Sequence, residues 1–341
     1  MLKQLGTLKR RSLVVGAAAL MALGGSVLTA EAGPGDGKTI QPMSTGRADH
    51  YFQHFVVQIG LERLGYDVKD HLEAAFPAMH LSIAQGDADY TAVHWDPLHQ
   101  KFYDQSGGDA RLTRVGKLIE GAAQGYLVDK ATAEKYGIDN LGQLKDAELA
   151  AVFDSDGDGK ANLTGCNPGW GCERVIEHQL DAFELRDSIN HDQGVYFALI
   201  ADTITRYRSG EPILYYTWSP LWVSSVLRPD VDTLWLNVPF TALPGERKDA
   251  DTSLPDGRNP GFTVNTIRIL ARKDFLADNP AANKFFELLA IPIGDVNAAI
   301  LRQHEGETDL AEIRRHAEEW VAANKTQFDA WLAEAKKAGN N

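Results

Sequence analysis

The sequence predicts an α/β protein of about two domains. Its 341 residues exceed the usual length of a single domain. Hydrophobic residues make up 44% of the chain and charged residues 24%, which is typical of a globular protein with a packed core. Apolar β-rich runs alternate with helical periodicity over roughly 300 residues. This alternation predicts mostly parallel sheets with helices between the strands.

Residues 1–32 are typical of a secretory signal peptide. A basic start is followed by an apolar run over residues 13–28, and Ala30-Glu31-Ala32 matches an A-x-A cleavage site. The alternative, a membrane anchor helix, is disfavoured because the run is shorter than the roughly 20 residues that a span needs. The Arg10-Arg11 pair leaves the export route open, and the absence of Cys at the cleavage site argues against a lipid anchor. We therefore expect a cleaved, exported chain.

The mature chain is strongly acidic. Removal of residues 1–32 takes away four basic groups and one acidic group, so the net charge changes from −13 to about −16. This charge argues against nucleic acid or anionic lipid as a partner.

The first elements can be placed from periodicity and turn residues. Residues 33–46 are rich in Gly, Pro and polar groups and are expected to form a flexible lead-in. A helix is predicted from Ala48 to Gly65, then a strand at 66–68 and a helix at 79–85 that ends at Gly86.

The same reasoning places the later elements. Strands are predicted at 90–94, 125–128, 213–216, 233–238 and 262–271, and helices at 131–136, 140–149, 173–183, 196–208, 280–289, 295–303 and 309–337. Ligands of such sheets bind at loops that follow the carboxyl ends of strands.

Three of the seven tryptophans stand beside turn-forming residues: Trp95, Trp170 and Trp218. Trp95 and Trp218 follow predicted strands, and Trp170 precedes a predicted helix. Indole faces attract cations, and an aromatic cage holds a quaternary ammonium, which has no N–H to donate. The alternative is that these rings only pack over loop ends.

The only cysteines, Cys166 and Cys172, lie six positions apart in a chain expected to be exported, which suggests one disulfide. The ring would close immediately before a helix. Backbone N–H groups of Gly171 and Cys172 at this helix start would suit a carboxylate or phosphate. A purely structural disulfide is the alternative.

Two further groups are candidates for binding. Asp154, Asp156 and Asp158 match the first half of a calcium loop, although Gly165 stands at the twelfth position where an acidic residue is expected. A solvent-exposed acidic turn is the alternative. His99, in Trp95-Asp-Pro-Leu-His99, could donate to an anionic group or serve as a structural hydrogen bonder. The sequence contains none of the common catalytic motifs G-x-S-x-G, Walker-type G-x-x-x-x-G-K-[ST] or H-E-x-x-H.

Four segments closely resemble the periplasmic glycine betaine/proline betaine-binding proteins of ProU-type transport systems. They are Thr91-Ala-Val-His-Trp95-Asp-Pro-Leu-His99, Gly121-Ala-Ala-Gln-Gly-Tyr-Leu-Val-Asp129, Asp158-Gly-Lys-Ala-Asn-Leu-Thr-Gly-Cys-Asn-Pro-Gly-Trp-Gly-Cys-Glu173 and Tyr215-Tyr-Thr-Trp-Ser-Pro220. The resemblance extends over residues 45–332. His94 and Asp96 differ from the polar residues expected beside Trp95, and Asp96 could add a negative charge near a bound cation or point to solvent.

The resemblance implies a two-lobe periplasmic binding protein fold (type II-like) with the ligand in the cleft between the lobes. Lobe 1 would comprise residues 47–124 and 262–341, and lobe 2 residues 125–261. In the family's pattern Trp95, Trp170 and Trp218 match the aromatic box for trimethylammonium, while His99, Gly171 and Cys172 match the carboxylate site. Cys166 and Cys172 match its disulfide.

The resemblance also implies the function. We expect a periplasmic, monomeric substrate-binding protein that captures glycine betaine, and proline betaine as well, for the permease and ATPase of an ABC importer in osmoprotection. It would need no cofactor and bind no nucleic acid, with structural calcium at the acidic loop left open. The alternatives are a binding protein for choline or another quaternary ammonium compound, and an exported enzyme acting on such compounds.

Overall fold

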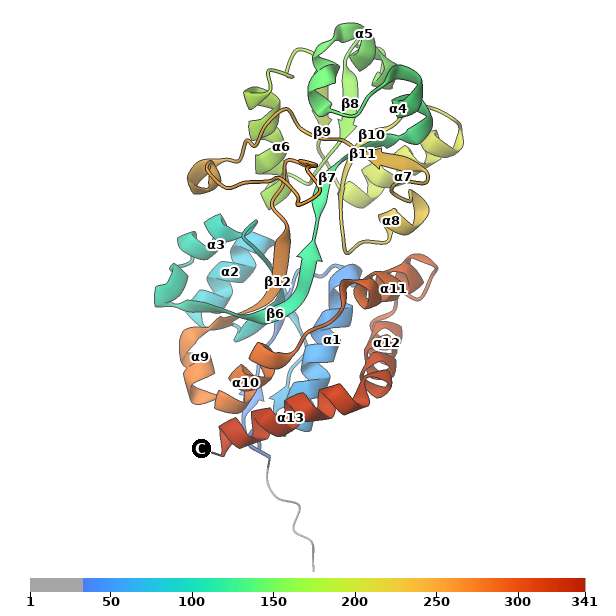
Figure 1. Ribbon diagram of the computed structural model, residues 1–341. Coiled ribbons are helices and arrows are strands. Elements are labelled where there is room, and N and C mark those ends of the chain that lie inside the picture. Colours follow the sequence, from blue (N-terminus) through green and yellow to red (C-terminus); the bar gives the residue numbers. More distant parts are fainter. Residues whose placement is uncertain (1–32, 341) are drawn as a thin grey trace, which may run out of the picture. The chain divides into compact units, whose positions relative to one another are not determined.

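The structure is a computed structural model that describes residues 33–340. The predicted signal peptide, residues 1–32, lies outside the described residues. Within residues 33–340 the chain forms two α/β lobes, each built around its own sheet (Figure 1). The predicted α/β class is therefore confirmed. No helix between residues 33 and 340 has both the length and the apolar character needed to cross a membrane.

Lobe 1 is built on a three-stranded sheet with the strand order β5-β12-β6. These strands are β5 (Tyr90–Asp96), β12 (Asn265–Arg272) and β6 (Leu112–Ala122). Helix α1 (Ala48–Arg63) packs against β5, and α10 (Pro280–Leu288) packs against β6. The other helices of this lobe are α2 (Phe76–Gln85), α3 (Gln100–Gln105), α9 (Lys273–Asp278), α11 (Ile293–His304), α12 (Leu310–Ala323) and α13 (Lys325–Gly339).

Lobe 2 is built on a five-stranded sheet with the order β11-β7-β10-β8-β9. Its strands are β7 (Gln124–Asp129), β8 (Ala161–Thr164), β9 (Ile189–Asp192), β10 (Leu214–Trp218) and β11 (Thr233–Trp235). Its helices are α4 (Lys130–Tyr136), α5 (Ala147–Ala150), α6 (Gly171–Ala182), α7 (Tyr196–Arg208) and α8 (Val223–Val226). Short 3₁₀ turns complete the chain at Gly108–Ala110, Leu141–Lys145, Ala151–Phe153 and Gly245–Arg247.

Two stretches of chain connect the lobes. Strand β6 leads into β7 with only Ala123 between them, and the segment 236–264 returns from β11 to β12 (Figure 1). The division of the lobes at residues 124/125 and 261/262 remains a prediction.

The prediction of mostly parallel sheets is wrong. In lobe 1, β12 is antiparallel to both of its neighbours, and in lobe 2 β7 is antiparallel to β10 and β11. Among the strands of residues 33–340, only β8 has parallel partners on both sides, namely β9 and β10. Helix–strand alternation identifies the elements, but strand direction depends on the end of the sheet at which each connection returns. A strand that arrives from the other lobe enters the sheet from the end opposite to the one used by strands connected within the lobe. The local sequence pattern does not encode this direction.

The lead-in at residues 33–46 is not the flexible segment that its composition predicted. Strand β1 (Thr39–Ile40) pairs with β3 (Asp67–Val68), and β2 (Met43–Ser44) pairs with β4 (Leu72–Glu73). Ile40 and Met43 are buried in the core. Burial of these two apolar side chains and the strand pairing together hold the segment against lobe 1.

Several helix ends follow the sequence closely. Gly86 takes a left-handed conformation with φ of 94° and ends α2, and Gly65 does the same with φ of 96° just after α1. Within α1, Gly60 is required for packing, because a Cβ at this position would lie 2.0 Å from the Phe285 ring. The helix predicted over 140–149 is instead a 3₁₀ turn and the short α5, separated at Asp146, whose carboxylate accepts from the N–H of Glu148.

Candidate ligand-binding site

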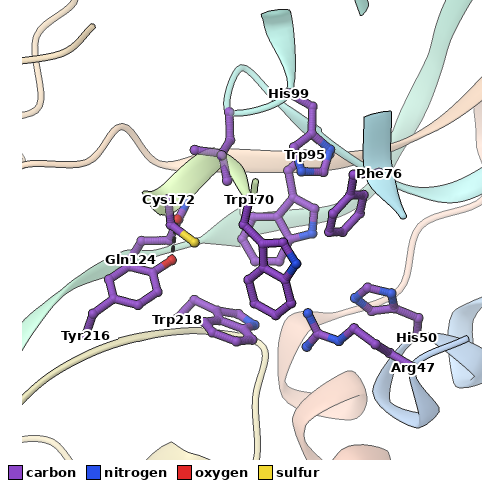
Figure 2. Close-up of a pocket in the computed structure, with 12 residues that line it drawn as sticks. Arg47, His50, Phe76, Trp95, His99, Gln124, Trp170, Cys172, Tyr216 and Trp218 are labelled. Atoms are coloured by element: carbon purple, nitrogen blue, oxygen red, sulfur yellow. Dashed lines mark hydrogen bonds between the residues drawn. The ribbon is translucent and has the colours of Figure 1, made fainter. Parts of the chain in front are cut away.

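A pocket lies between the two lobes, and all six predicted ligand-binding residues line it (Figure 2). Lobe 1 supplies the end of β5 and the start of α1, and lobe 2 supplies the end of β10 and the start of α6. The twelve lining residues are Arg47, His50, Phe76, Trp95, Leu98, His99, Gln124, Trp170, Gly171, Cys172, Tyr216 and Trp218.

Trp170 and Trp218 meet in an edge-to-face pair. Their ring centroids are 5.7 Å apart and their planes are inclined by 74°. Trp218 is the last residue of β10, and Tyr196 supports its ring from a centroid distance of 4.5 Å. The Tyr196 hydroxyl forms hydrogen bonds to the Tyr216 carbonyl at 3.1 Å and to Thr217 Oγ1 at 2.9 Å. These contacts fix the direction in which the Trp218 face points.

Trp95 and His99 are placed by the carboxyl end of β5. The backbone N–H of Trp95 donates to His99 Nδ1 at 3.2 Å. Burial lowers the pKa of His99 well below its usual value, so the imidazole is neutral. Because Nδ1 accepts a hydrogen bond, the ring proton is on Nε2, which can donate to an anionic group in the pocket.

Helix α6 begins at the pocket. Gly171 and Cys172 stand in its first turn, where backbone N–H groups have no carbonyl partner within the helix, and the side chain of the N-cap residue Trp170 supplies no capping hydrogen bond. The helix dipole adds positive potential at this end. A Cβ on Gly171 would lie 2.7 Å from Leu98 Cγ, so glycine allows α6 to approach lobe 1.

The predicted disulfide is present. Cys166 and Cys172 are joined, with their Cα atoms 6.2 Å apart. The bond closes the turn that precedes α6. The backbone N–H of Cys166 also donates to His191 Nε2 at 3.2 Å, which anchors the turn to β9.

The sequence reasoning missed six lining residues, and four of them, Arg47, His50, Phe76 and Gln124, stand in no predicted site motif and reach the site only through folding. Tyr216 and Gln124 are joined by a 2.6 Å hydrogen bond from the tyrosine hydroxyl to Oε1. The Gln124 amide nitrogen is buried without a partner among the described residues. Phe76 packs against His99 at a centroid distance of 4.3 Å. Tyr216 adjoins Trp218 in a single run of sequence and could have been found there.

Arg47 places a cation on the aromatic cluster. Its guanidinium carbon lies 4.7 Å from the Trp170 ring centroid and 5.2 Å from that of Trp218. Asp49 holds the guanidinium through hydrogen bonds to Nε at 2.9 Å and to Nη2. Burial is the largest single influence and raises the pKa of Asp49, but the charge of Arg47, the neighbouring His50 and the hydrogen bonds to the carboxylate together outweigh it, so the net pKa is lowered. The carboxylate is therefore ionised.

Beside the pocket, His80, His94 and His99 form a buried cluster in which one nitrogen of each lies within 4.8 Å of the others. His80 Nδ1 contacts the Phe76 carbonyl at 2.7 Å and must carry a proton. His80 Nε2 therefore accepts from His94 Nδ1 at 2.9 Å. Both ring nitrogens of His80 are therefore engaged in hydrogen bonds, and we assign the His80–His94 pair a packing role.

Asp96, next to Trp95, does not line the pocket. Its carboxylate accepts from Arg114 at 3.1 Å and from Arg268 at 2.8 Å. These ion pairs turn its charge toward the sheet of lobe 1.

The acidic loop lies apart from the pocket, between residues 153 and 161. Asp154, Asp156 and Asp158 have carboxylate oxygens within 4.8 Å of one another. Asp154 accepts hydrogen bonds from the backbone N–H groups of Gly157 and Gly159 at 2.7 and 2.8 Å. These bonds account for the loop's shape, and calcium binding remains a prediction.

Comparison with known proteins agrees with this geometry. The model of the family "Substrate binding domain of ABC-type glycine betaine transport system" matches residues 38–323. The chain is 51% identical over 305 residues to the glycine betaine-binding periplasmic protein OusX of Dickeya dadantii (strain 3937), which covers 89% of this chain and 92% of that protein. It is 48% identical, with the same coverage, to the glycine betaine/proline betaine-binding periplasmic protein of Salmonella typhimurium (strain LT2).

The fold is shared with more distant solved structures. Lactococcal OpuAC, solved in its closed-liganded conformation complexed with glycine betaine, matches with a TM-score of 0.65 at 19% identity, covering 86% of this chain and 99% of that chain. This likeness supports the two-lobe fold that the sequence predicted. Because the family model covers most of the described residues and the identity reaches half of the aligned positions, the chain belongs to the family of substrate-binding domains of ABC-type glycine betaine transport systems.

Proposed function

We propose that this chain captures glycine betaine, and proline betaine as well, and delivers it to an ABC importer. The observation that carries the proposal is the pairing of tryptophan faces with an uncapped helix start in one pocket. Trp95, Trp170 and Trp218 would surround the trimethylammonium group. His99 Nε2 and the N–H groups of Gly171 and Cys172 would bind the carboxylate.

The energetics support this assignment. Each desolvated cation–π contact contributes about 2 kcal/mol, and each hydrogen bond to a charged group about 1.5–3 kcal/mol. Micromolar affinity requires about −8 kcal/mol after the costs of association are met. Three aromatic walls and three donors supply roughly 10–15 kcal/mol before those costs, which is the order of magnitude that such an affinity requires.

The cellular setting forms part of the proposal. Residues 1–32 would direct export and be removed, so that the mature chain acts in the periplasm as a monomer. Its partners would be the membrane permease and the ATPase of the importer. Members of the family are transport proteins rather than enzymes. We propose that this chain likewise has no catalytic activity and requires no cofactor.

Calorimetric titration of the mature protein tests the proposal. We expect micromolar or tighter binding of glycine betaine and weaker binding of choline, which would leave the carboxylate donors without a partner. Replacing Trp170→Ala should weaken betaine binding at least tenfold, whereas Trp331→Ala, on α13 away from the pocket, should leave it unchanged. Absence of betaine binding over a range of salt concentrations would refute the assignment, and tighter binding of choline would favour the alternative ligand class.

A further inference from the structure

The pocket contains a single formal charge, and it is positive. Among the twelve described residues that line the pocket, Arg47 is the one that is charged at neutral pH. Burial lowers the pKa of His50 to about 3 and that of His99 well below its usual value, so both rings are neutral. Asp49 forms a salt bridge with Arg47 and does not line this pocket. The tryptophan faces of this pocket suit a cationic ligand group, yet the positively charged guanidinium of Arg47 borders the same pocket.

Arg47 is held firmly in this position. Only 14% of its side chain and 8% of that of Asp49 are exposed, and the two form a salt bridge. The guanidinium also lies 5.2 Å from the Phe197 ring centroid, in addition to its contacts with Trp170 and Trp218. Arg47 precedes α1 of lobe 1, whereas the three rings belong to lobe 2. Figure 2 shows the guanidinium pointing toward the tryptophans.

Arg47 also lies between the tryptophan pocket and a second pocket at the surface. It lines both the tryptophan pocket and a neighbouring surface pocket that contains Asp49, Phe197 and Trp222. A ligand in the tryptophan pocket would lie close to this largely buried charge, where charge–charge interactions are less screened than in open solvent.

We propose that Arg47 is a specificity-determining residue that selects zwitterionic betaines over cationic ligands such as choline. Choline presents an unbalanced positive charge to the guanidinium. A betaine carries no net charge, and the attraction of its carboxylate to the guanidinium offsets part of the repulsion of its ammonium group. This inference rests on the proposed function and adds the residue that would set its ligand class.

Dissociation constants for glycine betaine and choline, measured by calorimetry on the mature protein, test the inference. Arg47→Met keeps length and contact with the rings but removes the charge. We expect the ratio of the dissociation constant for choline to that for glycine betaine to fall about tenfold in this variant, mostly through tighter choline binding. Arg47→Lys keeps the charge and should leave the ratio within about threefold of wild type.

Two further variants separate charge from packing. Arg47→Met leaves Asp49 buried without its partner, so the double variant R47M/D49N, in which the pair is replaced by neutral groups, should show the same fall in the ratio. Arg314→Met removes a comparable arginine that lies 5.8 Å from the Phe55 ring and pairs with Glu62, and should leave the ratio unchanged.

The outcomes are distinguishable. If wild type binds betaine and the ratio stays within twofold in both R47M and R47M/D49N, Arg47 only packs and the inference is overturned. An equal loss of affinity for glycine betaine and choline would also show that Arg47 only packs. If wild type binds no betaine, the proposed function fails and the inference fails with it.

Discussion

At the scale of single residues, the site shows what local sequence can and cannot reveal. Trp95, Trp170 and Trp218 could be chosen because each stands beside turn-forming residues, at the end of a strand or the start of a helix, where a ring can line a pocket. Arg47 could not, because its contact with Trp170 joins residues more than 120 positions apart and depends on how the lobes meet. The residues chosen from motifs line the pocket, whereas residues such as Arg47 and Phe76, which stand in no recognisable motif, were missed.

His99 offers a prediction at this scale. Replacing His99→Leu removes the Nε2 donor, so betaine affinity should fall about tenfold to a hundredfold, as expected for one hydrogen bond to a charged group. Choline has no carboxylate, so its affinity should change by less than about threefold. Parallel calorimetric titrations of both ligands measure the two effects. Equal losses for betaine and choline would show that His99 supports the pocket rather than the carboxylate.

At the scale of elements, helices were predicted better than strands. The apolar periodicity of α1 and the glycine after α2 locate these helices from sequence alone. Strands β8 and β9 have only four residues each, and β6 mixes polar and apolar residues, so their sequences gave no clear period. These strands are formed by pairing with distant neighbours, a tertiary effect that overrides local preference.

The start of α6 leads to a prediction about an element. Gly171→Ala adds a Cβ that would meet Leu98 at 2.7 Å and push α6 away from lobe 1. We expect betaine affinity to fall about tenfold, because a shift of this size misplaces the N–H donors. Gly294→Ala, in α11 with open space around its Cβ position, is the matched control and should leave binding intact. Unchanged affinity in G171A would mean that the helix start does not need this close approach.

At the scale of the whole molecule, the described part of the chain buries many neutral histidines. His54, His80 and His94 are fully buried, and burial is the main cause that lowers the pKa of each. His71 lies beside His54 at a centroid distance of 4.7 Å, and burial lowers its pKa to about 4. The composition gives ten histidines but not their burial, so this property could not be predicted from sequence.

Acid should therefore destabilise the folded chain. A histidine whose folded pKa lies below the unfolded value near 6.5 binds fewer protons when folded, so its contribution to stability is present above pH 6.5. That contribution is lost as the pH falls from about 6.5 toward the folded pKa. Each such histidine adds up to about 1.4 kcal/mol per pH unit to the loss. Urea unfolding at pH 7.5, 6.0 and 5.0 should show a steep decrease in the free energy of unfolding.

His54 isolates one contribution to that slope. Neither of its ring nitrogens has a hydrogen-bond partner among the described residues, and an unsatisfied buried polar group lowers stability. His54→Leu replaces this group with an apolar side chain of similar volume. We expect the variant to be at least as stable as wild type at pH 7.5 and to lose about 1 kcal/mol less per pH unit below 6. His178→Leu, at an exposed position on α6, serves as the control and should keep the wild-type slope. A slope in His54→Leu equal to that of wild type would show that His54 does not take up a proton on unfolding in this range, and that other groups set the acid sensitivity.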